Sequence, residues 1–480
     1  MSCLLILLYF IIGCVSTQIG GFMSNVFEEK NIQKAIVTLG IPAMLGTLAT
    51  LIYNMADTYF VSMTKNPAQI AAVTLCTPIL LIIMSVSSIF GMGGSSVIAR
   101  MLGEKKSEQA KKCITFCVYA MAVSGIVILA LGCLFMNQIA GIAGADEENL
   151  LYTNDYLRWI FIGAPVIILS NGMVHLFRSA GLIKEATIGI VIGNGINIVL
   201  DWVFIVLMGK GTAGAALATS VGFLCSTVYY FACMVREISK GNELYSLSPK
   251  SLSVTPAMTA DVVKIGIPGA LITVMISVSN IVLNNYISIY GSDAVAAYGI
   301  AYKIDMFPIM LSVGLSQGVA PLMGYCFGAG QNTRLRKVMR YATIDGIILG
   351  GLFTALFLTA SPILAGIFLT DKELVTLSAS FLRVLALSAP CIGIINTVTS
   401  YFQALGKAIN SLVITLMRNL ILFIPGVILL NKFFGLDGAI AAQPVVEGIL
   451  SVVCIVMYII GIEAEMKRPA SNSEAVSATV

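Results

Sequence analysis

The sequence predicts an all-α polytopic membrane protein: twelve transmembrane helices form two parallel six-helix repeats, an N-lobe and a C-lobe, around a central cleft. Three observations lead to this fold class. The 480 residues are 58% hydrophobic and only 11% charged, with a mean hydropathy of +0.94, whereas a soluble domain carries about 25% charged residues. Apolar runs recur along the chain, each long enough to cross ~30 Å of hydrocarbon. The second half also repeats the first.

The apolar runs define the predicted helices. In chain order they cover 35–60, 69–100, 113–136, 155–178, 186–207, 213–235, 265–290, 294–327, 341–363, 377–405, 411–430 and 438–462. The runs at 69–100 and 294–327 are longer than a perpendicular span needs, so we expect those two helices to tilt or to project beyond the bilayer.

The repeat is visible as matched segments separated by a nearly constant offset. "LGIPAML" at 39–45 matches "IGIPGAL" at 265–271, and "GTAGAALA" at 211–218 matches "GLDGAIAA" at 435–442. The offsets are 226 and 224 residues. Because each half has an even number of helices, both halves enter the membrane from the same side. They are therefore parallel repeats related by an axis along the membrane normal.

Domain limits and orientation follow from the loops. We expect an N-terminal extension at 1–30, of which 1–22 has no role in transport, an N-lobe at 31–235, a cytoplasmic linker at 236–264, a C-lobe at 265–462 and a cytoplasmic tail at 463–480. With both termini cytoplasmic, 21 of the 28 Lys and Arg residues lie on the cytoplasmic side, as the positive-inside rule requires for a protein of the cell membrane. The other seven are Lys65, Arg158, Lys210, Lys303, Lys372, Arg383 and Lys432.

Several function classes are disfavoured. The net charge of +4 comes from loops, without the clustered basic face that nucleic-acid binding needs. The chain has no P-loop and no catalytic cluster near a membrane surface, so we expect neither an enzyme nor a cofactor. The 11 cysteines lack metal or redox spacing and are interpreted as small buried hydrophobes.

Acids inside apolar runs are the first candidates for a functional site, because ionisable residues are rare within membrane helices. Five occur: Asp57, Asp201, Asp305, Asp345 and Glu447. Asp345 lies near a helix start, where it reaches water. Asp305 lies two residues after Lys303, and side chains at this spacing on a helix do not face each other. Glu447 is interpreted as a hydrogen-bonded structural acid.

Two of these acids have polar companions at one depth. Tyr53 and Asp57 share a face of the first helix, and Asn197 and Asp201 share a face of the fifth. Asp201 and Thr219 each lie about 6 residues, ~9 Å, below the outer surface, and Asp57 lies near that level. The sequence therefore predicts an ion-coupling site at these five residues. The simpler alternative is that Asp57 merely ends its helix in the headgroup region.

The ion is left open by the residue types. Carboxylate, amide and hydroxyl oxygens of Asp57, Asp201, Asn197 and Thr219 suit Na⁺, while two acids close together can instead share one proton. At the repeat offsets the second half has Leu283, Gly426 and Gln443 in place of Asp57, Asp201 and Thr219. The predicted site thus belongs to one lobe only.

The segments "YNMADTYFV", "NGINIVLDWVFI" and "GTAGAALAT" resemble the MATE (multidrug and toxic compound extrusion) family, especially its DinF-like prokaryotic branch, over residues 30–462. The resemblance implies that Tyr53, Asp57, Asn197, Asp201 and Thr219 couple a cation or proton to transport. The NorM-like branch places acids in the seventh and tenth helices, where this sequence has none.

The resemblance implies a secondary antiporter that exports small amphipathic, often cationic compounds in exchange for Na⁺ or H⁺ by alternating access. Polar candidates for the substrate cleft are Asn171, Asn280, Asn284 and Gln317. The alternative is that half of them form interhelical hydrogen bonds instead. His175 is interpreted as a packing residue. We expect a monomer that binds small organic molecules within the bilayer, since one chain encloses a full pathway.

The alternative function is a flippase for lipid-linked oligosaccharides, from the same wider superfamily. Such a cleft is expected to carry several basic residues for pyrophosphate. Here the sequence places only Arg418 deep in the membrane, where it would bond backbone carbonyls or an acid.

Overall fold

The computed structural model describes residues 26–64, 66–146, 148–252, 255–369 and 371–466, and these residues form helices joined by short turns, with no strand among them. The part of the predicted extension before residue 26 and the part of the predicted tail after residue 466 lie outside the described residues. The all-α fold class is confirmed.

The first half contains six spans after a short turn, η1 (Val26–Glu28). They are α2 (Ile32–Ser62), α3 (Pro67–Gly103), α4 (Ser107–Leu134) with the short α5 (Met136–Ile142) after it, α6 (Leu150–Ser179), α7 (Ile183–Asp201) continued by the π-helical η2 (Trp202–Leu207), and α8 (Gly211–Ser239).

The second half follows the turn η3 (Pro249–Leu252). It contains α9 (Pro256–Ser288), α10 (Ser292–Gly328), α11 (Asn332–Gly366), α12 (Lys372–Ala386) and α13 (Ala389–Ala404), α14 (Ala408–Leu416), the π-helical η4 (Met417–Ile421), and α15 (Phe423–Met466). The pair α12 and α13 is one span bent by 44°. The helix α15 breaks at Gly435, whose φ of 62° suits glycine. Counted this way, the described residues contain the twelve predicted spans.

Most predicted helix limits agree with the structure to within six residues, but two helices begin nine residues earlier. The helix α9 starts at Pro256 rather than 265, and α11 at Asn332 rather than 341. Thr255 caps α9 by accepting a hydrogen bond from the Met258 amide at 3.3 Å, and proline is favoured in the first turn that follows. The turns added at these two helix starts contain charged residues, such as Asp261 in α9 and Arg336 in α11, and project beyond the apolar runs. Hydropathy alone therefore misses them. The connection between the halves shortens to 240–255.

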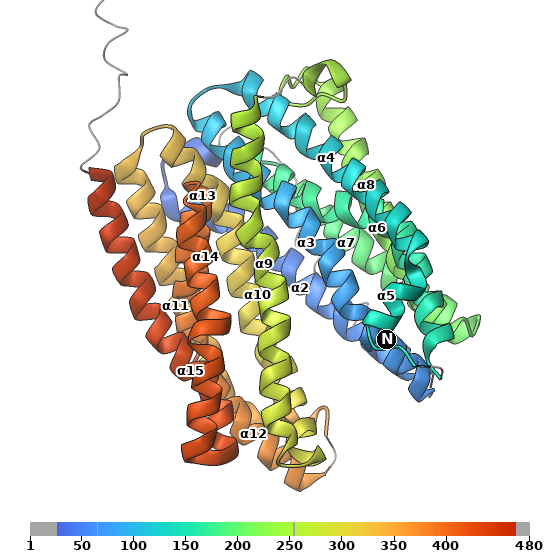
Figure 1. The fold of residues 1–480 in the computed structure, drawn as a ribbon. Helices are drawn as coiled ribbons and strands as arrows, with labels where there is room; N and C mark the ends of the chain where they lie inside the picture. The colour runs from blue at the N-terminus through green and yellow to red at the C-terminus, as the bar shows by residue number, and fades with distance from the viewer. Residues whose placement is uncertain (1–25, 65, 147, 253–254, 370, 467–480) are drawn as a thin grey trace, which may run out of the picture.

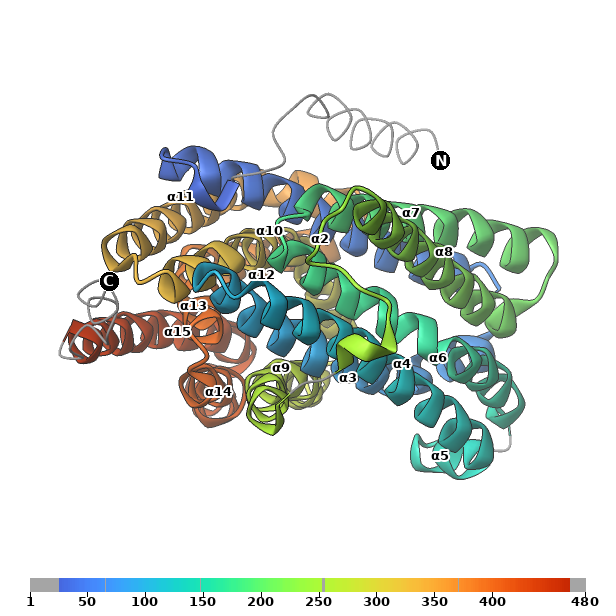
Figure 2. The same cartoon turned by 90° about the horizontal axis from the view of Figure 1, so that it is seen from above.

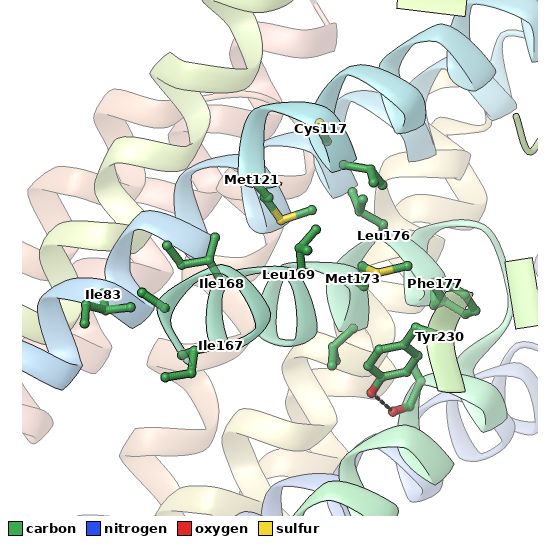
Figure 3. Close-up of a cluster of buried hydrophobic side chains, with 14 of the residues drawn as sticks. Ile83, Cys117, Met121, Ile167, Ile168, Leu169, Met173, Leu176, Phe177 and Tyr230 are labelled. Atoms are coloured by element: carbon green, nitrogen blue, oxygen red, sulfur yellow. Dashed lines mark hydrogen bonds between the residues drawn. The ribbon is translucent and has the colours of Figure 1, made fainter. Parts of the chain in front are cut away.

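Each lobe has a hydrophobic core. In the N-lobe, α6 is the central helix, and Ile167, Ile168, Met173 and Phe177 pack against its neighbours (Figure 3). The Tyr230 hydroxyl donates a hydrogen bond to the Ala186 carbonyl at 2.8 Å, which ties α8 to α7. The C-lobe has two further clusters, one of which also includes residues of the first turns of α2. The two lobes are therefore joined by apolar packing where α2 begins.

Close helix crossings join the lobes. We call the end of the bundle where α2 begins and α3 ends the basic face. In the half of the bundle nearer this face, α3 packs against α9 and α10, and α2 packs against α10 (Figure 2). A Cβ added at Gly93 would overlap the Val262 carbonyl oxygen, and one added at Gly266 would overlap the Ile89 carbonyl oxygen. Glycine therefore allows the backbones of α3 and α9 to touch.

Hydrogen bonds between the lobes gather from the middle of the bundle to the basic face. Thr47 donates to the Met310 carbonyl at 2.9 Å, Ser96 to the Gln403 carbonyl at 2.6 Å, and Gln33 to the Asp345 carboxylate at 2.9 Å. Toward the opposite face the lobes diverge, so that α5, at the right of Figure 1, and α12, at its lower edge, lie apart. The molecule is thus joined at the basic face and parted at the other.

Candidate ion-coupling site and cleft

The structure brings the five predicted coupling residues together in the N-lobe. Tyr53 and Asp57 lie on α2, Asn197 and Asp201 on α7, and Thr219 on α8. The helix α7 packs against both α2 and α8. Tyr53 also packs with Ile198 in a small apolar cluster that closes the site between α2 and α7.

Hydrogen bonds link these side chains. Asn197 donates from Nδ2 to Thr219 Oγ1 at 3.3 Å, and the Thr219 hydroxyl also bonds to the Tyr53 hydroxyl. The carboxyl groups of Asp57 and Asp201 lie within hydrogen-bonding distance of each other. Asp201 is completely buried, and α2 continues beyond Asp57 to Ser62. Asp57 therefore lies before the end of α2 and faces a buried partner on α7. This does not fit the alternative that Asp57 merely ends its helix.

The oxygens of this cluster fit a cation or a proton. Within the described residues, Asp57 Oδ1, both carboxylate oxygens of Asp201 and Asn197 Oδ1 are buried without a hydrogen-bond donor. Two carboxyl groups can hydrogen bond only when one of them carries a proton, and a buried carboxylate without compensation is destabilising by several kcal/mol. Either a shared proton or a monovalent cation held by carboxylate and amide oxygens would compensate this cluster.

Two features of the site escape the sequence pattern. The π-helical turn Trp202–Leu207 follows Asp201 directly, and such turns often occur at functional sites. Tyr156 of α6 is buried and lies within electrostatic range of Asp57 and Asp201. It is six residues from the start of α6, or ~9 Å in depth. The predicted run started at residue 155 and therefore placed Tyr156 at the surface, so the depth comparison missed it.

The predicted cleft residues divide into two pairs. Asn280 and Gln317 line a cavity of about 240 Å³ in the C-lobe, and Asn280 also hydrogen bonds to Tyr302. Asn171 instead donates to the Ile167 carbonyl of its own helix at 3.0 Å, and Asn284 is exposed on α9. Neither is among the residues that line this cavity.

A charged network lies at one side of the cavity. Arg418, in the π-helical η4, donates to Glu447 Oε1 from Nε at 2.9 Å and from Nη2 at 2.7 Å. A third hydrogen bond runs from Arg418 Nη1 to Asn396 Oδ1 at 3.2 Å. The predictions that Arg418 bonds an acid and that Glu447 is hydrogen bonded are confirmed. Asp305 accepts from Gln443 at 3.1 Å, while Lys303 is exposed.

Comparison with known proteins shows the family. The family model described as MatE matches residues 42–203 and again 268–429, which together exceed half of the chain. The chain belongs to the MATE family. The two matches begin 226 residues apart, the same offset that separates Pro42 from Pro268. The DinF-like branch stays a prediction.

Curated relatives of this MATE protein include two multidrug export proteins MepA. That of Staphylococcus haemolyticus (strain JCSC1435) is 31% identical over 88% of this chain and 92% of its own length. That of Staphylococcus aureus (strain MSSA476) is 29% identical over 90% of this chain and 95% of its own length.

Solved structures share the fold. A MATE protein crystallised in complex with MaL6 has a TM-score of 0.88 at 24% identity, covering 93% of this chain and 100% of its own. A MOP superfamily transporter from Pyrococcus furiosus has a TM-score of 0.85 at 23% identity, covering 94% and 100%.

One basic residue of this MATE protein is more buried than its sequence position indicates. Arg178 is near the end of α6, which the sequence places at the membrane surface, yet it is only 2% exposed. Its Nη1 donates to Gln317 Oε1 of the other lobe at 2.8 Å. The sequence did not indicate this burial, because it arises where the other lobe covers the end of α6. That Arg418 alone lies deep in the membrane stays a prediction. His175 and Gln317 line a neighbouring cavity of about 40 Å³.

Proposed function

We propose that this MATE protein is a secondary antiporter of the cell membrane that exports small amphipathic, often cationic organic compounds in exchange for Na⁺ or H⁺. The observation that carries the coupling is the buried carboxyl pair of Asp57 and Asp201 with its unpartnered oxygens. The export of organic compounds is supported by two relatives that are described as multidrug export proteins. This chain matches both of them over nearly their full length.

The proposed orientation places the basic face in the cytoplasm. Most Lys and Arg residues lie in the loops and helix ends at that face, and such loops are usually cytoplasmic. The lobes are then joined on the cytoplasmic side and parted on the outside, an outward-open arrangement. Export requires the reverse arrangement as well, in which the glycine crossings at Gly93 and Gly266 separate while the outer ends of the lobes meet. We assign both termini to the cytoplasm on the same basis, and we expect the single chain to work as a monomer.

Coupling needs a cation that binds the two arrangements with different affinity. The helix α2 provides a physical route, because it carries Asp57 and contacts both α7 of its own lobe and α10 of the other. Neutralising the Asp57–Asp201 pair would change how α2 packs against α7, and therefore how it packs against α10. Cation binding would in this way bias the rocking of the lobes.

The flippase alternative is less well supported by the cleft. Pyrophosphate recognition needs cationic side chains free to bind phosphate oxygens. Arg418 directs three hydrogen bonds to Glu447 and Asn396, and Arg178 bonds to Gln317 between the lobes. The basic residues of the cleft are thus engaged with neighbouring side chains.

The first prediction tests coupling. Asp57→Asn and Asp201→Asn should each abolish export, because the amide cannot take up or release a proton or compensate a cation charge. Efflux of a fluorescent organic cation from cells and from proteoliposomes measures this. Both variants should stay folded in the membrane, as judged by size-exclusion chromatography of the purified protein.

Asp155→Asn is the matched control, since Asp155 is an exposed acid on α6 next to Tyr156. It should export at the wild-type rate. Separately imposed Na⁺ and H⁺ gradients in the proteoliposomes identify the coupling ion. Continued gradient-driven export by both buried-site variants would contradict the proposal.

A further inference from the structure

We propose that the C-lobe cavity binds the charged group of an organic monocation, and that a charge cluster of Asp305, Arg418 and Glu447 selects for that charge. This inference rests on the proposed function that the chain exports small organic compounds, and it assigns their charge recognition to a site separate from the N-lobe pair.

The size of the cavity argues for an organic ligand. Its volume of about 240 Å³ equals about eight waters at ~30 Å³ each, far more than a bare ion fills. Apolar side chains form much of its wall: Ile272, Ile276, Ile309, Met310, Val313 and Phe423. The ring of Tyr302 lies among them, and aromatic faces attract organic cations.

With both of its acids ionised, the charge cluster carries a formal negative charge that no donor in the described residues fully compensates. Glu447 lines the cavity at 6% exposure, and Arg418 bonds to its Oε1 alone; Oε2 is buried without a donor within the described residues. Asp305 is fully buried, with Oδ2 bonded to the cavity residue Gln443 and Oδ1 likewise unpartnered. Two carboxylates against one guanidinium leave a formal charge of −1. Removing such a charge from water is costly unless a cation accompanies it.

This cluster is independent of the predicted coupling site. Its residues lie on α10, η4 and α15, whereas the coupling residues lie on α2, α7 and α8. Gln443 stands at the repeat position of Thr219, so the C-lobe has a different polar arrangement at that position. The π-helical turn that carries Arg418 aims its guanidinium at Glu447 and at the cavity wall.

The test measures binding to the purified full-length chain by equilibrium dialysis, with no gradient present. Methyltriphenylphosphonium is the cationic probe, and triphenylphosphine oxide is an uncharged probe of nearly the same shape. Asp305→Asn and Glu447→Gln each bring the cluster to a formal charge of zero. Each should weaken cation binding by roughly tenfold or more and leave binding of the uncharged probe unchanged.

A double variant tests the charge directly. Arg418→Gln combined with Glu447→Gln restores a formal charge of −1, so it should bind the cation within about threefold of wild type. Glu447→Gln alone leaves a buried guanidinium without its acid and can fail to fold. Asp305→Asn retains the Gln443 partner and the double variant removes both charges of the ion pair, so these two proteins carry the test.

Three results would overturn the inference: unchanged cation binding in Asp305→Asn, equal losses for both probes, or a double variant as weak as the single ones. Because the assay needs no transport, it separates this inference from the coupling proposal. If the chain binds the cation selectively but fails every gradient experiment, the antiport proposal is refuted and the binding inference stands.

Discussion

At the scale of single residues, the coupling site shows how buried polar groups depend on one another. Thr219 joins Tyr53 of α2 to Asn197 of α7, since its hydroxyl accepts from Asn197 Nδ2 at 3.3 Å and bonds to the Tyr53 hydroxyl. Asn197 Oδ1 remains available beside the carboxylates. The hydroxyl of Thr219 therefore orients an amide that we expect to contact the coupling ion.

The second prediction follows from this role. Thr219→Val keeps the side-chain shape but removes the hydroxyl, which leaves the Asn197 amide and the Tyr53 hydroxyl without this partner, at about 1–3 kcal/mol each. We expect a lower melting temperature and a weaker dependence of stability on Na⁺ or on pH. Thr227→Val is the matched control, because Thr227 of the same helix bonds only to the Val166 carbonyl at 3.0 Å. It should lower stability without changing the ion dependence. An equal ion dependence in both variants would argue against a coupling role for Thr219.

At the scale of helices, the contact between α3 and α9 depends on the absence of side chains. Gly93 and Gly266 face the partner backbone in a reciprocal manner, each against a carbonyl oxygen of the opposite helix. Packing at backbone distance maximises van der Waals contact without bulky side chains that would interlock the helices. Side chains that do not interlock suit a contact that separates and forms again, as the proposed alternating access requires.

The third prediction concerns this crossing. Gly93→Ala should push α3 from α9, with an overpacking cost of roughly 1–3 kcal/mol in the arrangement joined at the basic face. Export should fall, and the distance between labels placed at Glu108 and Arg336 through unnatural amino acids should lengthen. Gly351→Ala is the control, because a Cβ at that helical glycine meets nothing within 4 Å. If Gly93→Ala keeps the wild-type distance and rate, the crossing is not a gate.

At the scale of the whole molecule, polar links between the lobes lie from the middle of the bundle to the basic face, where the lobes are joined. Arg178 is the most unusual of them, because a fully buried guanidinium bonds to a neutral amide of the opposite lobe. When the basic face opens, this contact must break. The bond between Arg178 and Gln317 thus stabilises the arrangement that the structure shows.

The fourth prediction is that Gln317→Leu shifts the equilibrium toward opening at the basic face. Hydrogen bonds to charged groups contribute about 1.5–3 kcal/mol, so the shift should be roughly tenfold or more. Distance distributions between the Glu108 and Arg336 labels measure the two populations. Asn171→Leu serves as the control, since Asn171 bonds within its own helix. Identical distributions in both variants would show that Arg178 does not hold the lobes together.

The sequence by itself determined the spans and the repeat, and it predicted which five polar residues lie together in the N-lobe. Apolar run length predicts membrane helices because the bilayer has a fixed thickness. Counting residues from a common surface places side chains at one depth because the helical rise is constant. Asp57, Asp201 and Thr219 were accessible to this reasoning, whereas Tyr156 was not, because the predicted helix started only at residue 155.

Only the tertiary structure decided what lies between distant helices. Hydropathy assigned Arg178 to the surface because it cannot register that α10 of the other lobe covers the end of α6. It treated Asp305, Arg418 and Glu447 as separate charges, since their contact depends on how α10, η4 and α15 pack. The joining of the lobes at the basic face also arises from packing, because the glycines permit close approach but do not specify which arrangement of the lobes forms.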